Sequence, residues 1–328
     1  MDNHARARED IQMTEQARGA RVTVVGESLV DIIHDPRVSG VADETHPGGS
    51  PMNVAVGCAR LGLETSLVTH FADDPHGRMI AGHLAANDVV AIVDDAPPTS
   101  SALATLDHTG AAQYTFTLGW DLADAADAAL AAVAGSLHVH TGSIATVLAP
   151  GSDMVFRLVE AARERATVSF DPNCRPAISP DADEVRRQTE GFVAASDIVK
   201  ASDEDLRWLY PDRTLDDSME AWLGLGPALV ALTRGADGPV LLSRSGRVDL
   251  PGESITVADT VGAGDSFMAG LISGLAQLDA LGADGRERLR ALDRDSLRTL
   301  AAYANRAAAI TCSRRGANPP RTAELGSI

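Results

Sequence analysis

The clearest chemical pattern in the sequence is a glycine-rich segment, DTVGAGDSF, at residues 259–267. Its small residues Gly262, Ala263 and Gly264 stand at the start of a predicted helix and leave the first backbone N–H groups uncovered. With the positive end of the helix dipole, these donors form a cradle for an anion such as phosphate. Asp265 follows directly and is suited to accept the proton of an attacking hydroxyl, as in phosphoryl transfer to an alcohol. An ordinary glycine turn with an aspartate in the first helical turn explains the spacing equally well.

A second group of glycines and polar residues opens the first long predicted helix. Gly48 and Gly49 allow a close approach of the backbone, and Asn53 offers donors and an acceptor from the helix start. Asp31 lies just beyond the first predicted strand, where the ligands of open α/β sheets bind. A carboxylate and an amide in one crevice suit a polyol, which presents adjacent hydroxyl groups. Taken singly, Asp31 is also explained as a turn residue and Asn53 as a cap or surface side chain.

The elements that must position these residues alternate along the chain between strand-like and helix-like patterns. Ser50 is predicted to cap the first long helix, with Pro51 at its first helical position. Further helices are predicted at about 76–86, 263–276 and 296–312. The predicted strands begin at Arg21 and continue with 65–69, 89–93, 137–140, 168–171, 198–200, 228–233 and 240–243. Such alternation implies an α/β fold with parallel crossovers and a sheet covered on both faces.

Two segments break this alternation and predict a small β lid at the ligand edge of the sheet. Residues 30–46 are extended and polar, and residues 100–118 alternate as two strands around a turn at 107–110. We expect residues 1–20 to be a disordered leader, with Met13 as an alternative start, and residues 321–328 to be a C-terminal tail. No linker divides the rest, so one large domain with a lid is the preferred organisation.

Composition and charge exclude several classes of function. The 328 residues are 45% hydrophobic and 23% charged, which is typical of a globular chain and excludes a disordered or collagen-like protein. No apolar run approaches the roughly 20 residues of a membrane span. The net charge of −18 disfavours nucleic acid and anionic membranes as partners, so an anionic nucleotide would need local positive potential. The three scattered cysteines are typical of reduced thiols in a cytoplasmic protein.

Together the motifs resemble those of the ribokinase-like (PfkB) carbohydrate kinases. Residues 259–272 match that family's C-terminal signature, and residues 48–62 match its N-terminal signature. At the position of the final glycine of the N-terminal signature, this chain has Ala72 instead. The resemblance extends over residues 21–320 in order and spacing. It implies a ribokinase-like three-layer α/β sandwich with a mostly parallel central sheet and a small β lid formed by about 30–46 and 100–118.

The resemblance also implies an ATP-dependent enzyme that phosphorylates a primary hydroxyl of a small sugar with the help of Mg²⁺. Asp31, Gly48, Gly49 and Asn53 would hold the sugar. The amides at residues 262–264 would receive the developing phosphate charge, and Asp265 would take the hydroxyl proton.

Two further motifs look more like those of fructokinases than those of nucleoside kinases. They are GESLVD at residues 26–31 and DPNCR at residues 171–175, in which Arg175 would bring a cation to the sugar or the phosphate. Fructose is therefore the first expected substrate. The alternatives that stay open are 2-keto-3-deoxygluconate and ribose.

Metal sites are implied at two places. Ser202 and Asp205 occupy the position of an Asn-x-x-Glu element that helps to organise magnesium and phosphate in the family; Ser202 is alternatively a plain helix cap. Asp259, with Thr311 and Gly316, lies where family members often bind a monovalent cation, which adds K⁺ to the expected cofactors.

A nucleotide loop is implied by Thr233, Gly235 and Gly238, although a plain hairpin turn would show the same glycines. Asn305 matches a position that approaches the adenine.

Lids in this family often pair into homodimers, so a second copy of the chain is an expected partner beside sugar and ATP. A competing hypothesis is a non-catalytic sugar- or nucleotide-binding regulator. The intact Asp265 argues against it, because a sensor has no need of a base.

Overall fold

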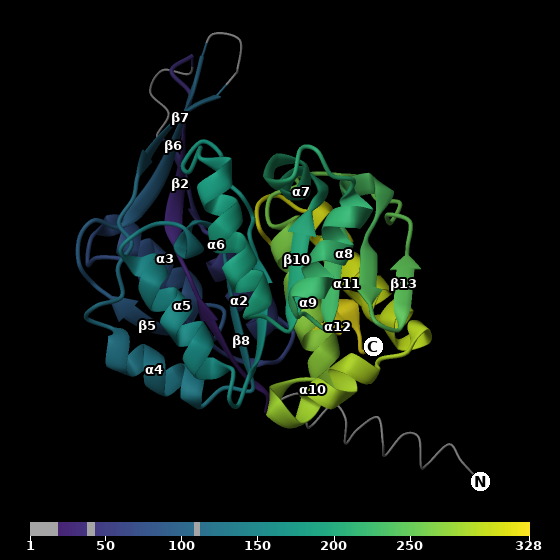
Figure 1. The fold of residues 1–328 in the computed structure, drawn as a ribbon. Helices are drawn as coiled ribbons and strands as arrows, with labels where there is room; N and C mark the ends of the chain where they lie inside the picture. The colour runs from purple at the N-terminus through teal and green to yellow at the C-terminus, as the bar shows by residue number, and fades with distance from the viewer. Residues whose placement is uncertain (1–18, 38–42, 108–111) are drawn as a thin grey trace.

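The computed structural model describes residues 19–37, 43–107 and 112–328 (Figure 1). Its central feature is a nine-stranded sheet with the order β13-β12-β11-β10-β9-β8-β1-β4-β5. The strands of this sheet are β1 (Arg21–Val25), β4 (Glu64–His70), β5 (Val90–Asp94), β8 (His138–Gly142), β9 (Thr167–Asp171), β10 (Ile198–Ser202), β11 (Leu229–Thr233), β12 (Val240–Ser243) and β13 (Gly246–Asp249). The strands from β5 to β11 in this order pair in parallel, and β12 and β13 are added antiparallel. The α/β fold with a mostly parallel sheet is therefore confirmed.

Helices cover both faces of this sheet, as Figure 1 shows. Side chains alternate along each strand, so that Val22 and Val24 of β1 join one core cluster and Val25 joins the other. The helices that contribute to the first cluster are α2 (Ser50–Arg60), α3 (Pro75–Ala85), α9 (Ala263–Gln277), α10 (Gly282–Ala291), α11 (Arg294–Cys312) and α12 (Thr322–Leu325). Those of the second are α4 (Ala126–Ala134), α5 (Gly151–Ala162), α6 (Ala182–Ala194), α7 (Asp203–Leu209) and α8 (Leu215–Leu225). The result is a three-layer sandwich.

The start of α2 differs from the sequence prediction. The helix begins at Ser50 itself, and Gly49 occupies the N-cap position with φ 110°. A Cβ at residue 49 would lie 2.6 Å from the carbonyl oxygen of Glu27, so this backbone conformation and close approach require glycine. The prediction that Ser50 caps the helix was therefore wrong, and its hydroxyl is directed to another partner.

Several helices of the structure are absent from the sequence prediction, α10 and α12 among them. Helix α10 carries alternating charges and glycines and buries only a few side chains, of which Leu289 is the largest, so its sequence has a weak helical pattern. Helix α12 lies within the expected C-terminal tail, where Leu325 is buried and the backbone N–H of Ile328 donates to Gln277. The expected helices at 263–276 and 296–312 are confirmed as α9 and α11.

A second, four-stranded sheet has the order β3-β2-β6-β7, and its β6 and β7 project from the molecule in Figure 1. Its strands are β2 (Leu29–His34), β3 (Glu44–Gly48), β6 (Ser100–Leu106) and β7 (Ala112–Thr117). One face carries Val30 and Ile32, which pack on the first core. The other face carries Asp31, which is paired with Ala102 of β6, and Ala102 is paired in turn with Phe116 of β7.

Some expectations concern residues outside the described ranges. The leader at 1–18 and most of the turn at 107–110 belong to these. Within the described residues, no single helix is long and apolar enough to cross a membrane; α9 and α10 together reach that length but bend by 98° between them.

Candidate active site

The glycine-rich segment forms the N-terminus of α9. Gly262 is the N-cap residue with a left-handed φ of 75°, and the N–H of Ser266 donates to its carbonyl as the first helical bond. The N–H of Ala263 donates to Thr260 at 3.2 Å. The next two residues, Gly264 and Asp265, stand at helix positions whose N–H groups have no partner within the helix. These donors and the helix dipole have the arrangement that the sequence analysis expects of an anion cradle.

The carboxylate of Asp265 is held by the first turn of α2. The hydroxyl of Ser50 donates to its Oδ1 at 2.6 Å, and the side-chain amide of Asn53 donates to its Oδ2 at 2.8 Å. Ser50 and Asn53 are three residues apart and so share one face of the helix. All three side chains are buried. The structure thus brings together the two motifs that the sequence placed more than two hundred residues apart.

The expected sugar-binding residues lie where the small sheet meets α2. Asp31 lies beyond β1, in β2, within the segment 30–46 that the sequence predicts to be extended. A Cβ on Gly48 would overlap the Asp31 carboxylate, so glycine at this position lets the carboxylate lie across β3. Burial raises the pKa of Asp31, and the nearby charges of His46 and Arg175 oppose that rise. Gly49 links this sheet directly to α2 and Asn53.

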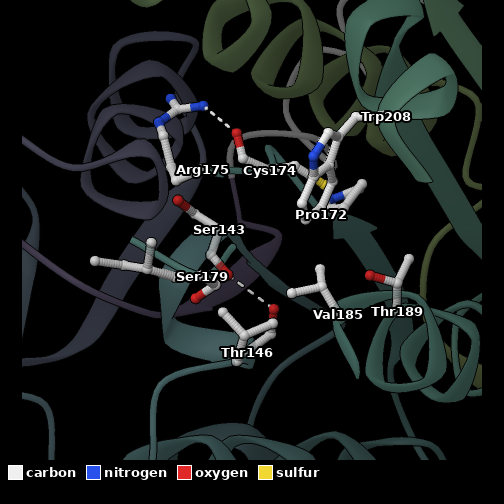
Figure 2. A pocket seen from close by; sticks show the side chains of 11 residues that line it. Ser143, Thr146, Pro172, Cys174, Arg175, Ser179, Val185, Thr189 and Trp208 are labelled. Atoms are coloured by element: carbon white, nitrogen blue, oxygen red, sulfur yellow. Dashed lines mark hydrogen bonds between the residues drawn. The ribbon is translucent and has the colours of Figure 1, made fainter. Parts of the chain in front are cut away.

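Arg175 lies close to two carboxylates of this region. Its guanidinium donates to the backbone carbonyls of Asn173 and Cys174, and Figure 2 shows the second of these bonds. Its charge opposes the rise in pKa of Asp31 and also that of the fully buried Glu27. Burial raises the pKa of Glu27 to about 7, against hydrogen bonds that include one from the N–H of Ala145 at 3.1 Å.

The cavity shown in Figure 2 is not the site itself. It lies between Ser143, Pro172, Cys174 and Trp208 and has a volume of about 10 Å³. This is the space of a single water molecule, too small for a sugar. Arg175 is exposed at its margin. The arrangement of Asp265, Ser50 and Asn53 therefore defines the site better than the cavity does.

A buried ion pair lies behind the cradle. Lys200, in β10, places its Nζ 2.7 Å from Oδ2 of Asp171, the last residue of β9. Burial raises the pKa of Asp171 to about 6, and Lys200 opposes this while Asp205 and Asp265 add to it. Burial lowers the pKa of Lys200, but the same three carboxylates outweigh burial, so the net direction is upward. Lys200 and Asp171 therefore form a buried ion pair at hydrogen-bond distance.

Sequence reasoning gave Lys200 no role, although one signal was present. The chain has 28 lysine and arginine residues, and Lys200 is the only lysine among them. Its partner Asp171 stands 29 residues earlier, so nothing next to Lys200 in the sequence indicates the ion pair.

Ser202 and Asp205 form a capping box at the start of α7. Oδ2 of Asp205 accepts from the N–H and the hydroxyl of Ser202 at 2.8 and 2.6 Å, and its Oδ1 accepts from the N–H of Cys174 at 2.8 Å. The helix-cap interpretation of Ser202 is thus what the structure shows. The described residues contain no group of three His, Cys, Asp or Glu side chains placed to hold a metal.

Magnesium nevertheless fits this region. It usually binds through one or two carboxylates, several waters and the phosphates of the substrate. The charges of Asp205 and Asp265 both raise the pKa of Asp171, so the three carboxylates lie within electrostatic range of one another. Their excess of negative charge over Lys200 matches a hard cation that arrives with a nucleotide.

The expected nucleotide loop connects two antiparallel strands. Thr233 ends β11, Gly235 starts a short 3₁₀ turn, η2 (Gly235–Asp237), and Gly238 leads into β12 with φ 78°. A Cβ on Gly238 would overlap the backbone at residues 250–252. Asn305 of α11 reaches the same segment, because its side-chain amide donates to the carbonyl of Pro251 at 3.1 Å. The structure therefore places these four residues around one loop.

Asp259 closes the loop that precedes α9. Its carboxylate accepts from the N–H of Val261 at 3.1 Å and from the N–H of Gly316 at 2.9 Å. These backbone bonds hold the pKa of Asp259 below its usual value. Thr311 bonds to Ser266 at 2.7 Å and so lies under the same helix start.

Comparisons with known proteins agree with this geometry. The family model described as "pfkB family carbohydrate kinase" matches residues 20–324. A fructokinase of Rhizobium leguminosarum bv. trifolii is 32% identical over 286 residues, 83% of this chain and 84% of that protein. The crystal structure of a Vibrio cholerae O395 fructokinase with fructose, ADP and a calcium ion has a TM-score of 0.76 and 26% identity, covering 93% of this chain and 97% of that one. A double mutant of that protein, with fructose, ADP and a potassium ion, has a TM-score of 0.77, 25% identity and the same coverage.

Proposed function

The chain belongs to the pfkB family of carbohydrate kinases and is an ATP-dependent sugar kinase; from this premise we propose that its sugar is fructose, phosphorylated on a primary hydroxyl. The observation that carries the proposal is the position of Asp265. Its carboxylate stands at the anion cradle of α9 and is held there by Ser50 and Asn53. The fructokinase of Rhizobium leguminosarum and the fructose-bound protein of Vibrio cholerae support the choice of sugar.

In the proposed reaction, the hydroxyl oxygen attacks the γ-phosphorus of ATP while the bond to the bridging oxygen of ADP breaks. Asp265 accepts the hydroxyl proton. Its carboxylate needs no reorientation, because α2 already fixes both oxygens. In a loose phosphoryl transition state, most of the barrier is lowered by placement and charge, which the fixed carboxylate and the amides of α9 supply.

The sugar is proposed to lie between the small sheet and α2. Asp31 and Asn53 bond to its hydroxyls, Gly48 and Gly49 allow its approach, and Arg175 approaches the sugar or the transferred phosphate. The exposed edge of the small sheet acts as a lid that excludes water. The support for this is that Asp31 and Asn53 extend from neighbouring elements joined by Gly49.

Nucleotide and metal are proposed to bind along the ends of β9, β10 and β11. Magnesium would be held by the phosphates, water and Asp205, and it would neutralise charge on the phosphates when bound. Ser202 would assist there. The loop with Thr233, Gly235, Gly238 and Asn305 would receive the nucleoside. Asp259 would contribute to a monovalent cation site, for which the potassium ion in the Vibrio cholerae double mutant is the support.

We propose that the protein is cytoplasmic. Cys58, Cys174 and Cys312 are free thiols, which suits the cytoplasm. The face of the small sheet that bears Asp31 also bears Ile33 and Tyr114, whose side chains are 37% and 62% exposed. We propose that this apolar face pairs with a second copy of the chain.

The test is a panel of sugars with the purified chain, ATP and Mg²⁺, with and without K⁺. ADP release is coupled to an optical readout, and mass spectrometry identifies the phosphorylated sugar. We expect the highest kcat/KM with fructose. A higher value for ribose or 2-keto-3-deoxygluconate would overturn the choice of sugar. A chain that binds the sugar but releases ADP no faster with sugar than without it would overturn the assignment of this site and favour a regulator. In that case the ADP release of the wild type would equal that of the Asp265→Asn control.

A further inference from the structure

Lys200 stands apart from every other cation of the chain. It is the only lysine, and its side chain is 4% exposed. The other 27 of the 28 lysine and arginine residues are arginines, and the single lysine is buried. Lysine differs from arginine there in presenting a compact point charge on a flexible stem, whereas the guanidinium is a wide planar fork.

The surroundings of Lys200 explain the need for a compact cation. A Cβ on Gly264 would lie 2.8 Å from the Lys200 Nζ and 3.7 Å from its Cε. The ammonium therefore occupies the space that a side chain at the second residue of α9 would fill. Gly264 was predicted to keep the cradle amides uncovered; it also makes room for the charge beneath them.

Asp171 fixes the ammonium in this place. Its Oδ2 accepts from Nζ at 2.7 Å, and its Oδ1 accepts from the N–H of Asn173 at 3.2 Å, so the carboxylate cannot turn away without losing both contacts. Asp205 and Asp265 also act on Lys200 electrostatically. One cation thus stands among three carboxylates, directly behind the amides that face the transferred group.

We propose that Lys200 is a positioning residue for phosphoryl transfer, whose fixed charge behind Gly264 strengthens the anion cradle that holds the negatively charged transferred group. The proposal rests on the proposed kinase function of the same site. A charge acting through protein rather than bulk water is weakly screened, so a cation that does not touch the phosphate still lowers its energy. Lys200 would thereby also offset the repulsion that three carboxylates exert on an incoming nucleotide.

The competing explanation is that Lys200 only neutralises Asp171 and keeps the fold. A single variant and a double variant separate the two explanations. Lys200→Met leaves Asp171 buried without its partner and should lower Tm, as is usual for a broken buried ion pair. Combining Lys200→Met with Asp171→Asn removes both charges and should restore Tm. A structural role predicts that kcat recovers with Tm; a role in transfer predicts that kcat stays about 10- to 100-fold below wild type.

A second measurement does not depend on turnover. Because Lys200 is the only lysine, protein grown with ¹³C-lysine gives a single lysine Cε correlation by NMR, which Lys200→Met assigns by its loss. ADP, Mg²⁺ and aluminium fluoride together mimic the planar transferred group. We expect that complex to move the Lys200 signal further than ADP or fructose alone. Calorimetry should show that the double variant loses more affinity for the complex than for ADP.

The outcomes decide the two proposals separately. A wild-type chain that phosphorylates no sugar refutes the kinase function, while the ratio of affinities for the planar complex and for ADP still tests Lys200. The Lys200 proposal is overturned if the double variant regains kcat to within about 3-fold of wild type, or keeps the wild-type ratio of affinities. It is also overturned if the lysine signal follows fructose and ignores the nucleotide.

Discussion

Asp265→Asn is the most direct test of the proposed chemistry, because the structure indicates that little else changes. In the wild type, Oδ1 accepts from Ser50 at 2.6 Å and Oδ2 accepts from Asn53 at 2.8 Å. The variant's amide oxygen can keep the bond from Asn53. Its NH₂ can donate to Ser50, whose hydroxyl can turn and accept. The loss is limited to the charge that strengthens both bonds, about 1 kcal/mol of folding stability.

The effect on catalysis should be much larger. Without the carboxylate, no group at this position can take the hydroxyl proton, and removal of a general base typically costs about 10²–10⁴ in rate. This corresponds to about 3–5 kcal/mol in the activation barrier. Nucleotide affinity should be unchanged or higher, because a negative charge has been removed from beside the phosphates.

The assay measures kcat with fructose, ATP affinity by calorimetry and Tm for the same preparations. Ser50→Ala is the matched control, since it keeps the carboxylate and removes one of its two donors; we expect kcat to fall on the order of 10-fold. A folded Asp265→Asn variant that binds ATP and retains kcat within a few-fold of wild type would refute the reasoning. Another residue would then have to accept the proton.

Three other substitutions test separate parts of the structure. Asp31→Ala should raise the KM for fructose by about 10- to 100-fold through the loss of charged hydrogen bonds, with ATP affinity unchanged; a fall in ATP affinity instead would move Asp31 to the phosphate site. The folded-state pKa of Glu27 is raised from 4.5 to about 7, so its contribution to stability is present below pH 4.5 and is lost as pH rises through 7. Glu27→Gln should therefore change the free energy of unfolding more favourably at pH 7.5 than at pH 4.5, by about 3 kcal/mol. Urea denaturation of wild type and variant at both pH values measures this difference, and equal effects at the two pH values would contradict the raised pKa. Tyr114→Ser should convert the proposed dimer into a monomer in sedimentation velocity, and a wild-type chain that is already monomeric at micromolar concentration would exclude the interface.

The parts of the molecule that sequence could predict are those specified by neighbouring residues. The start of α9 follows from the small residues at 262–264, which leave the first amides of a helix uncovered. The buried parallel strands follow from short runs of β-branched residues. Both signals are complete within about ten residues. The helices and strands that were predicted therefore start within one or two residues of the predicted positions.

Contacts between distant segments could not be predicted in this way. The role of Ser50 depends on Asp265, 215 residues later, and on the conformation of Gly49, which makes Ser50 the first residue of the helix and not its cap. The role of Lys200 depends on Asp171 and on the missing side chain at Gly264. In each case the residue type is visible in the sequence, and its partner is chosen only by the way the sheet and its helices pack.

In the proposed site, Asn53 joins sugar binding to the proposed base, Asp265. Its side-chain amide has two N–H donors and a carbonyl oxygen, and one N–H is used on Asp265 at 2.8 Å. A sugar hydroxyl that bonds to the remaining groups of the same amide is brought within a few ångströms of the carboxylate that must take its proton. Recognition of the sugar and alignment for proton transfer then depend on a single rigid side chain at the start of α2. A sugar that cannot reach Asn53 is placed away from Asp265, so it binds without being aligned to react.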